Sequence, residues 1–185
     1  DLRQTAETGL GSAYEAVHAR GAQALESRNR SVLEPAAGLV TAELYADSSF
    51  PVSLYPHDGH SAAANEFMAK HAPALGFSPL NRIELRNSLR KAEAFGVISR
   101  EDRLFAFRQI QHDLDRAILV HVAVSWTNAF RRADELSEEH AAREGQRTID
   151  LLHVAVALEC DAKIFLSFDR RQRKLAHAAG LKVKP

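Results

Sequence analysis

Short apolar runs alternate with helical patterns from about residue 40 to the end of this 185-residue chain. The runs at residues 44–46, 75–78, 118–124 and 164–168 predict strands, and residues 180–183 predict one more. Strands that alternate with helices form a parallel sheet, because each helix carries the chain back across the sheet. We therefore expect an α/β fold, a three-layer α/β/α sandwich with a mostly parallel central sheet.

Polar residues at the starts of the helical patterns predict where the helices begin. Ser61, Asn81, Ser99 and Thr148 are each expected to cap a helix, because their short side chains accept hydrogen bonds from free backbone N–H groups. Asp102, three residues after Ser99, completes the pattern of a capping box. The helix that follows Ser99 carries an expected apolar stripe of Leu104, Phe107, Ile110 and Leu114.

The first 39 residues differ in composition from the rest of the chain. They are rich in Ala, Gly and Arg, and their helical pattern is short and interrupted by glycines. We expect residues 1–39 to be a loosely ordered extension and residues 40–185 to form one domain. Residue 1 is not Met, so we also hypothesise that Val40 is the natural start, from an initiation codon that was read as valine.

Composition narrows the class of protein. No apolar run approaches the roughly 20 residues that span a bilayer, and the first residues lack the apolar core of a secretion signal. The single cysteine, Cys160, excludes a disulfide within the chain and fits a reducing cytoplasm. Net charge is zero, with 24 basic and 24 acidic residues, so charge as a whole does not indicate nucleic-acid binding. Residues 161–185, with seven basic residues against two acidic ones, form either a solvated helix face or a phosphate-attracting patch.

Four acidic residues have distinctive local settings. Asp47 and Asp169 directly follow apolar strand candidates, and Glu84 and Asp150 lie near the starts of helices. In an open parallel sheet, such positions meet at the rim where sites are built. Four carboxylates in one place repel each other unless a cation lies between them, and oxygen ligands suit Mg²⁺ or Mn²⁺. The sequence therefore predicts a metal site made of these four acids.

Each acid taken alone also has a purely structural interpretation. Asp47 and Asp169 suit turns and helix caps, and Glu84 fits the charge patterning of a helix surface. Asp150 lies in a first helical turn, where the helix dipole favours an anion. His153, one turn after Asp150, is either a partner that orients Asp150 or a structural residue. Cys160 is expected to be a small buried apolar residue.

The combination of these segments resembles the PIN domain family, and most closely the VapC-type toxins, over residues 41–185. The run Asp47-Ser48-Ser49 is similar to the family's first acid with its hydroxyl neighbour, and Glu84 matches the helical second acid. The stretch Arg147-Thr148-Ile149-Asp150-Leu151-Leu152-His153 resembles the third acid, and Phe165-Leu166-Ser167-Phe168-Asp169 the fourth. Ser167 stands where the family often has Thr, and Pro51 enters the first helix; neither departure removes an acid.

The resemblance implies a metal-dependent endoribonuclease that is the toxin of a type II toxin–antitoxin pair. It also implies a homodimer and a protein antitoxin. Asp47, Glu84, Asp150 and Asp169 would then hold one or two Mg²⁺ or Mn²⁺ ions, and Ser48 or Ser167 would orient a carboxylate. Basic residues would hold the RNA phosphates, namely Arg82, Arg86 and the cluster at residues 170–174.

Three other readings of the residues stay open. The first is a housekeeping RNA-processing nuclease with the same site and no antitoxin. The second is a non-catalytic binding module in which the four acids are only caps and turn residues. The third, a receiver-like phosphoacceptor, is disfavoured because the late strand that ends before Asp169 is not followed by a lysine.

Overall fold

The computed structural model of the chain describes residues 42–55, 58–71 and 74–185. The predicted extension at residues 1–39 and the hypothesised start at Val40 lie outside the described residues, so both stay predictions.

The described residues form a five-stranded sheet in which every strand pair is parallel. Its strands are β1 (Leu44–Ala46), β2 (Leu75–Phe77), β3 (Leu119–His121), β4 (Ile164–Leu166) and β5 (Lys182–Lys184). They lie in the order β3-β2-β1-β4-β5. The predicted strands are all present, although β3 is shorter than the apolar run at residues 118–124.

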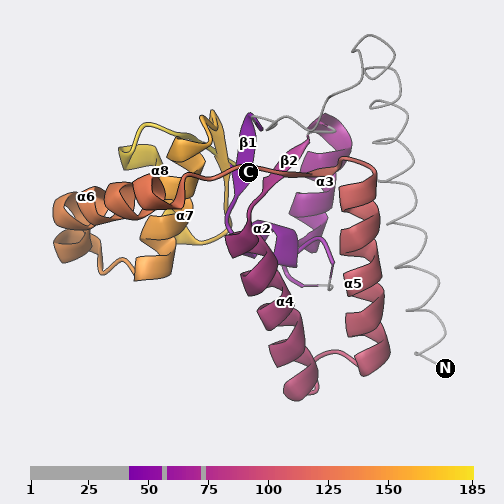
Figure 1. The fold of residues 1–185 in the computed structure, drawn as a ribbon. Coiled ribbons are helices and arrows are strands. Elements are labelled where there is room, and N and C mark those ends of the chain that lie inside the picture. The colour runs from indigo at the N-terminus through magenta and orange to yellow at the C-terminus, as the bar shows by residue number, and fades with distance from the viewer. Residues whose placement is uncertain (1–41, 56–57, 72–73) are drawn as a thin grey trace, which may run out of the picture.

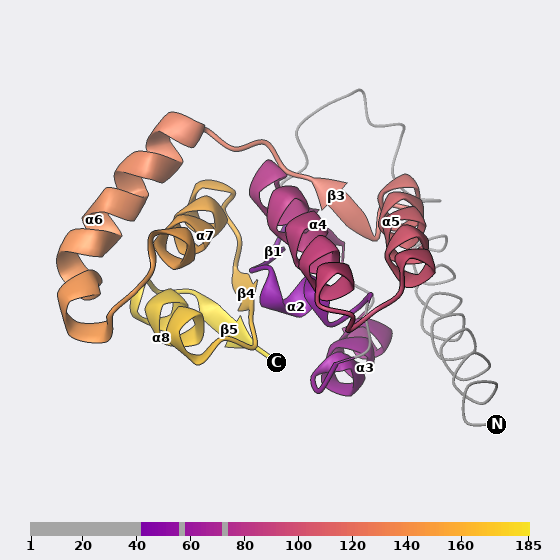
Figure 2. The same ribbon diagram turned by 90° about the horizontal axis from the view of Figure 1, so that it is seen from below.

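Seven described helices cover the two faces of this sheet (Figure 1). They are α2 (Ser49–Val52), α3 (Ser61–His71), α4 (Pro79–Ala94), α5 (Arg100–Asp115), α6 (Trp126–Glu144), α7 (Thr148–Glu159) and α8 (Arg170–Ala178). Figure 2 shows α6, α7 and α8 on one side of the strands and α3, α4 and α5 on the other. The three-layer α/β/α prediction is thereby confirmed.

Alternation along the strands divides the core into two parts. Tyr45 and Phe165 point into the core under α6, α7 and α8. Ala46 and Leu166, one residue further along each strand, point into the core under α2 to α5. Successive strand side chains face opposite sides, so a sheet that is buried on both faces needs apolar residues at nearly every position, as β1, β2 and β4 have.

Three predicted helix starts need correction. Ser61 is the first residue of α3 rather than its cap. Helix α4 is capped by Ser78 and has Pro79 at its first position, while Asn81 is the third helical residue and bonds back to the Ser78 N–H. Proline is tolerated at a helix start because the N–H that it lacks would be unpaired there. Helix α7 is preceded by Arg147 as its cap residue, not Thr148. The capping box of Ser99 and Asp102 is confirmed.

The predicted apolar stripe on α5 is only partly correct. Ile110 is buried, whereas Leu104 is 39% exposed, and the other buried residues of this helix are Ala106 and Asp113. Helix α7 is more deeply buried than a single stripe would make it, since every residue from Asp150 to Ala157 is buried. Among the described residues, none of the helices is apolar over enough length to cross a lipid bilayer.

The strand order places a switch point at the centre of the sheet. The chain moves outward from β1 through β2 to β3, and then returns to the other side of β1 to form β4 and β5. Ligands of open α/β sheets bind beyond the carboxyl ends of the strands at such a switch point. The backbone N–H of Asp47 donates to the Leu166 carbonyl at 3.0 Å, so the ends of β1 and β4 are held together there.

Candidate active site

Asp47 lies directly after β1, and its carboxylate is completely buried. Its Oδ1 accepts hydrogen bonds from the Ser49 backbone N–H at 3.0 Å and the Ser49 hydroxyl at 2.6 Å. Its Oδ2 accepts from the Ser167 hydroxyl at 2.7 Å. Burial raises the pKa of Asp47, and these hydrogen bonds together with His153 offset only part of that rise. A nearby cation would stabilise the charged form of this buried carboxylate.

Glu84 is brought to the same rim by helix α4. The Asn81 side chain donates to the Ala46 carbonyl at 2.8 Å, which fixes the start of α4 against the end of β1. The Ser48 hydroxyl donates to Glu84 Oε2, and His153 Nε2 contacts the same oxygen. Burial alone would raise the pKa of Glu84, but the contact with His153 and the Ser48 hydrogen bond lower it below its ordinary value. Glu84 is therefore held as a carboxylate.

His153 links this carboxylate to the core. It is 1% exposed, and its Nδ1 lies 3.1 Å from the hydroxyl oxygen of Tyr45. That hydroxyl lies 3.0 Å from Ser78 Oγ, at the cap of α4. The structure therefore pairs His153 with Glu84 and Tyr45, rather than with Asp150 as one sequence interpretation had it. A ring bonded through both nitrogens has a fixed orientation.

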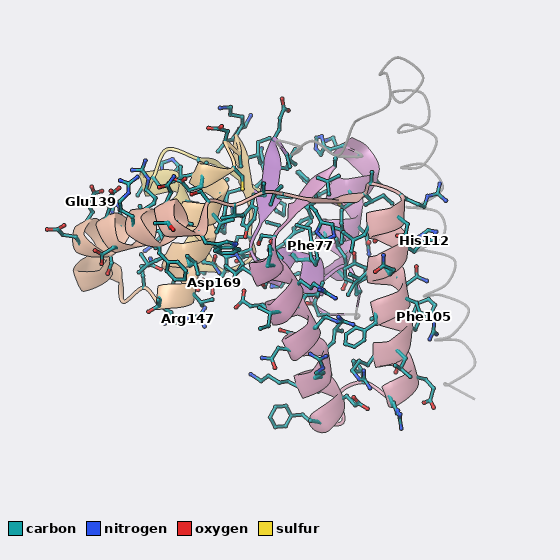
Figure 3. The ribbon with its side chains drawn as sticks, viewed as in Figure 1. Phe77, Phe105, His112, Glu139, Arg147 and Asp169 are labelled. Carbon is teal, nitrogen blue, oxygen red and sulfur yellow. The ribbon has the colours of Figure 1, made fainter. Side chains whose placement is uncertain are left out.

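Asp150 and Asp169 share one arginine, Arg147. Figure 3 labels Arg147 and Asp169 near the start of α7. The Arg147 guanidinium donates from Nε to Asp150 Oδ2 at 2.9 Å and from Nη2 to Asp150 Oδ1 at 3.0 Å. Nη2 also donates to Asp169 Oδ2 at 3.3 Å. The hydrogen bonds and charge of Asp150, with the charge of Asp169, raise the pKa of Arg147. Asp169 also caps α8, since its Oδ1 accepts from the Arg171 N–H at 2.8 Å.

The four predicted acids therefore gather at one rim, but as three separate units. Asp47 is held by serine hydroxyls, Glu84 by His153, and Asp150 with Asp169 by Arg147. Among the described residues, no group of three or more His, Cys, Asp and Glu side chains is spaced to hold one metal ion. The donor chemistry nevertheless fits Mg²⁺ or Mn²⁺, since all the donors are carboxylate oxygens. A cation also already binds two of them, namely the Arg147 guanidinium.

The family model of the PIN domain matches residues 44–178, a range that includes all four acids. The chain belongs to the PIN domain family. The fold is similar to solved structures, among them the following two. One is PAE2754 from Pyrobaculum aerophilum, at 18% identity and a TM-score of 0.52, over 79% of this chain and 92% of that one. The other is VapBC2 from Rickettsia felis bound to a DNA fragment from their promoter, at 17% identity and a TM-score of 0.53. That match covers 76% of this chain and 96% of that one. No curated protein matches the chain.

Basic side chains lie on α4 and around α8 of this PIN domain. On α4, Arg82 is exposed, whereas Arg86 stacks over the ring of Phe107 at 4.6 Å from its centroid. Beyond the site, a shallow pocket between α8 and β5 is lined by basic side chains. Those are Arg173, Lys174, His177, Lys182 and Lys184.

Three contributors to the site of this PIN domain are not predicted from the sequence. Ser49 binds Asp47 with both its backbone N–H and its hydroxyl, whereas the sequence favours Ser48 and Ser167 as partners of a carboxylate. Tyr45 is predicted only as a strand residue, although its hydroxyl contacts His153. Arg147 binds Asp150 and Asp169, whereas the sequence indicates no separate role for it. Its spacing of three residues before a first-turn Asp is a usable signal, because residues three apart lie side by side at a helix start.

Proposed function

We propose that this chain is a divalent-metal-dependent endoribonuclease and the toxin of a type II toxin–antitoxin pair. The observation that carries the proposal is the gathering of four acids at the β1–β4 switch point of a PIN domain. PIN domains are generally nucleases that use a divalent metal ion.

Each acid has a distinct environment that suits a role in holding the ion. We assign Asp47 as a direct ligand, because its desolvated charge is only partly offset by the hydroxyls of Ser49 and Ser167. Glu84, Asp150 and Asp169 complete the set, and some of them act through water, since Mg²⁺ keeps several waters. Ser48 and His153 both bind Oε2 of Glu84 and orient this carboxylate, as fixed partners of ligands usually do.

The ion would supply an acidified water molecule as the nucleophile and would neutralise charge that develops on the scissile phosphate. The protein's own contribution is preorganisation. Tyr45 and His153 hold Glu84 in place from the core side. Serine hydroxyls fix the carboxylate of Asp47, so little reorganisation is needed when the charge of the reacting phosphate changes.

RNA is the proposed substrate, and basic residues next to the acids support it. Arg82 is exposed on α4, the helix that carries Glu84, and Arg170 and Arg171 are exposed directly after Asp169. The pocket between α8 and β5 adds further basic side chains. Lys and Arg side chains bind phosphates irrespective of sequence. This arrangement supports binding of an RNA backbone across the acids.

The toxin assignment draws on the likeness to VapBC2. We propose a protein antitoxin as the partner of this chain, a homodimer as its assembly and the cytoplasm as its location.

RNA cleavage tests the nuclease. Purified protein should cut a mixed RNA pool with Mg²⁺ or Mn²⁺, and excess EDTA should stop it. Asp150→Asn should abolish cleavage and still fold, because asparagine keeps the shape of the buried side chain. Asp134→Asn is the matched control, since Asp134 is exposed on α6 and should not matter. Cleavage by a folded Asp150→Asn protein would contradict the site.

Growth measurements test the toxin. Induced expression in a bacterial host should arrest growth, Asp150→Asn should not, and Asp134→Asn should. Co-expression of the small protein encoded beside the gene should restore growth. A nuclease that cleaves RNA without arresting growth would instead be a housekeeping RNA-processing enzyme.

A further inference from the structure

Arg147 is a cation that already binds the acids proposed as metal ligands. Its guanidinium makes a two-pronged contact with Asp150 and a third hydrogen bond to Asp169. Asp150 is completely buried, whereas the side chain of Arg147 is 59% exposed and that of Asp169 is 29% exposed. The arginine therefore covers the acids from the solvent side.

The positions of these bonds leave little room for a second cation on Asp150. Its Oδ2 accepts from both Nε and the backbone N–H of Arg147, and its Oδ1 accepts from Nη2. A divalent ion that binds Asp150 and Asp169 must displace at least part of this set. It must also approach a positive charge, and charge repulsion is weakly screened where one of the partners is buried.

The guanidinium can move away from Asp150 into solvent. Arg147 has a long flexible side chain that is 59% exposed, and its backbone lies at the cap position of α7. The backbone N–H of Arg147 donates to Asp150 independently of the side chain, at 3.3 Å. The start of α7 can therefore persist when the guanidinium leaves.

We propose that Arg147 is an internal counter-ion that balances the acidic site in the metal-free protein and competes with the divalent ion for Asp150 and Asp169. The inference rests on the proposed function, because it concerns the same acids and the same ion. Arg147 sets how much free Mg²⁺ or Mn²⁺ is needed to fill the site, and it protects the metal-free protein from repulsion among its carboxylates.

Direct titration with Mn²⁺, without RNA, tests this role by calorimetry or by the electron paramagnetic resonance signal of free Mn²⁺. Arg147→Gln should bind Mn²⁺ about tenfold more tightly than the unmodified chain. Arg171→Gln is the matched control. It removes the same charge beside Asp169, where only the Arg171 backbone bonds to that acid, and it should change the Mn²⁺ affinity by less than about twofold.

Thermal unfolding gives a second readout. Without metal, Arg147→Gln should unfold at a lower temperature than the unmodified chain, because its acids are uncompensated. Added Mn²⁺ should raise the unfolding temperature of Arg147→Gln more than it raises that of the unmodified chain. Tighter binding to the folded state stabilises that state more.

The outcomes separate the inference from the proposed function. If the unmodified chain and Arg147→Gln bind Mn²⁺ equally, or the variant binds more weakly, the counter-ion role is wrong and the metal site stands. If neither protein binds Mn²⁺, the metal site of the proposed function fails and the inference fails with it.

Discussion

The Nε2 atom of His153 contacts the carboxylate of Glu84 and joins helix α7 to helix α4 across the candidate site. The two residues lie 69 positions apart in the sequence. Through Nδ1, the same ring reaches the Tyr45 hydroxyl on β1. One buried imidazole therefore connects three elements whose ends form the rim.

The Glu84–His153 contact predicts a pH dependence of stability. The pKa of Glu84 is below its ordinary value of 4.5 in the folded state, so its contribution is fully present above that value and is lost as pH falls through the lowered pKa. Glu84→Gln should unfold at lower urea than the unmodified chain at neutral pH, and the difference should shrink below pH 4.5. Glu66→Gln, on an exposed face of α3, should match the unmodified chain throughout. A difference that is constant with pH would contradict the assignment.

For Asp47, the pH dependence of stability should have the opposite sign. Burial raises its pKa above the ordinary 3.8, so the folded state loses stability from this group as pH rises from 3.8 through the raised value. Asp47→Asn should therefore stabilise the metal-free protein at neutral pH by about 1 kcal/mol, and should lose Mn²⁺ binding. The Asn amide can donate to Ser167 in place of the present bond. Urea unfolding in EDTA measures the first effect, and a loss of stability would refute the prediction.

Asp169 has two roles that a pair of variants can separate. Asparagine caps helices about as well as aspartate, so Asp169→Asn should lose RNA cleavage and keep its free energy of unfolding. Asp169→Ala should lose RNA cleavage, and its free energy of unfolding should fall by about 1 kcal/mol because the cap of α8 is missing. Cleavage assays and urea unfolding of the two proteins check this. Equal destabilisation of both variants would show that the charge, and not the cap, stabilises α8.

Cys160 should be unreactive in the folded protein. It is 6% exposed, and burial raises its pKa to about 11, so almost no thiolate is present at neutral pH. Iodoacetamide should modify it only after unfolding, as the added mass in a mass spectrum would report. Rapid modification of the native protein would contradict the burial of this side chain.

Gly76 should tolerate no side chain in strand β2, which lies between β3 and β1. An added Cβ would lie 3.0 Å from the Leu44 carbonyl oxygen and 3.1 Å from Val122 Cγ1. Gly76→Ala should lower the free energy of unfolding by roughly 1–3 kcal/mol. Gly59→Ala is the control, since a Cβ there meets nothing within 4 Å. Equal stability of the two variants in urea would contradict the tight packing at β2.

Local pattern was enough to predict the layers and the parallel sheet. Apolar runs of strand length and the capping box at Ser99 are short-range signals, and they survive in the structure because buried elements still obey local backbone preferences. The errors at Ser61, Asn81 and Thr148 are of one kind, since each residue lies inside the helix that it was expected to precede. Ser78 and Arg147 are the cap residues of the last two helices.

The sequence by itself determined the four acids and their positions at strand ends and helix starts. Only the tertiary structure decided their partners. The strand order puts β4 beside β1, so Ser167 reaches Asp47 across 120 positions. Helices α7 and α4 lie on opposite sides of the sheet, and His153 contacts Glu84 at the rim instead of Asp150. Partner choice depends on which elements pack together, and that packing is fixed by burial of the whole core, which no local spacing encodes.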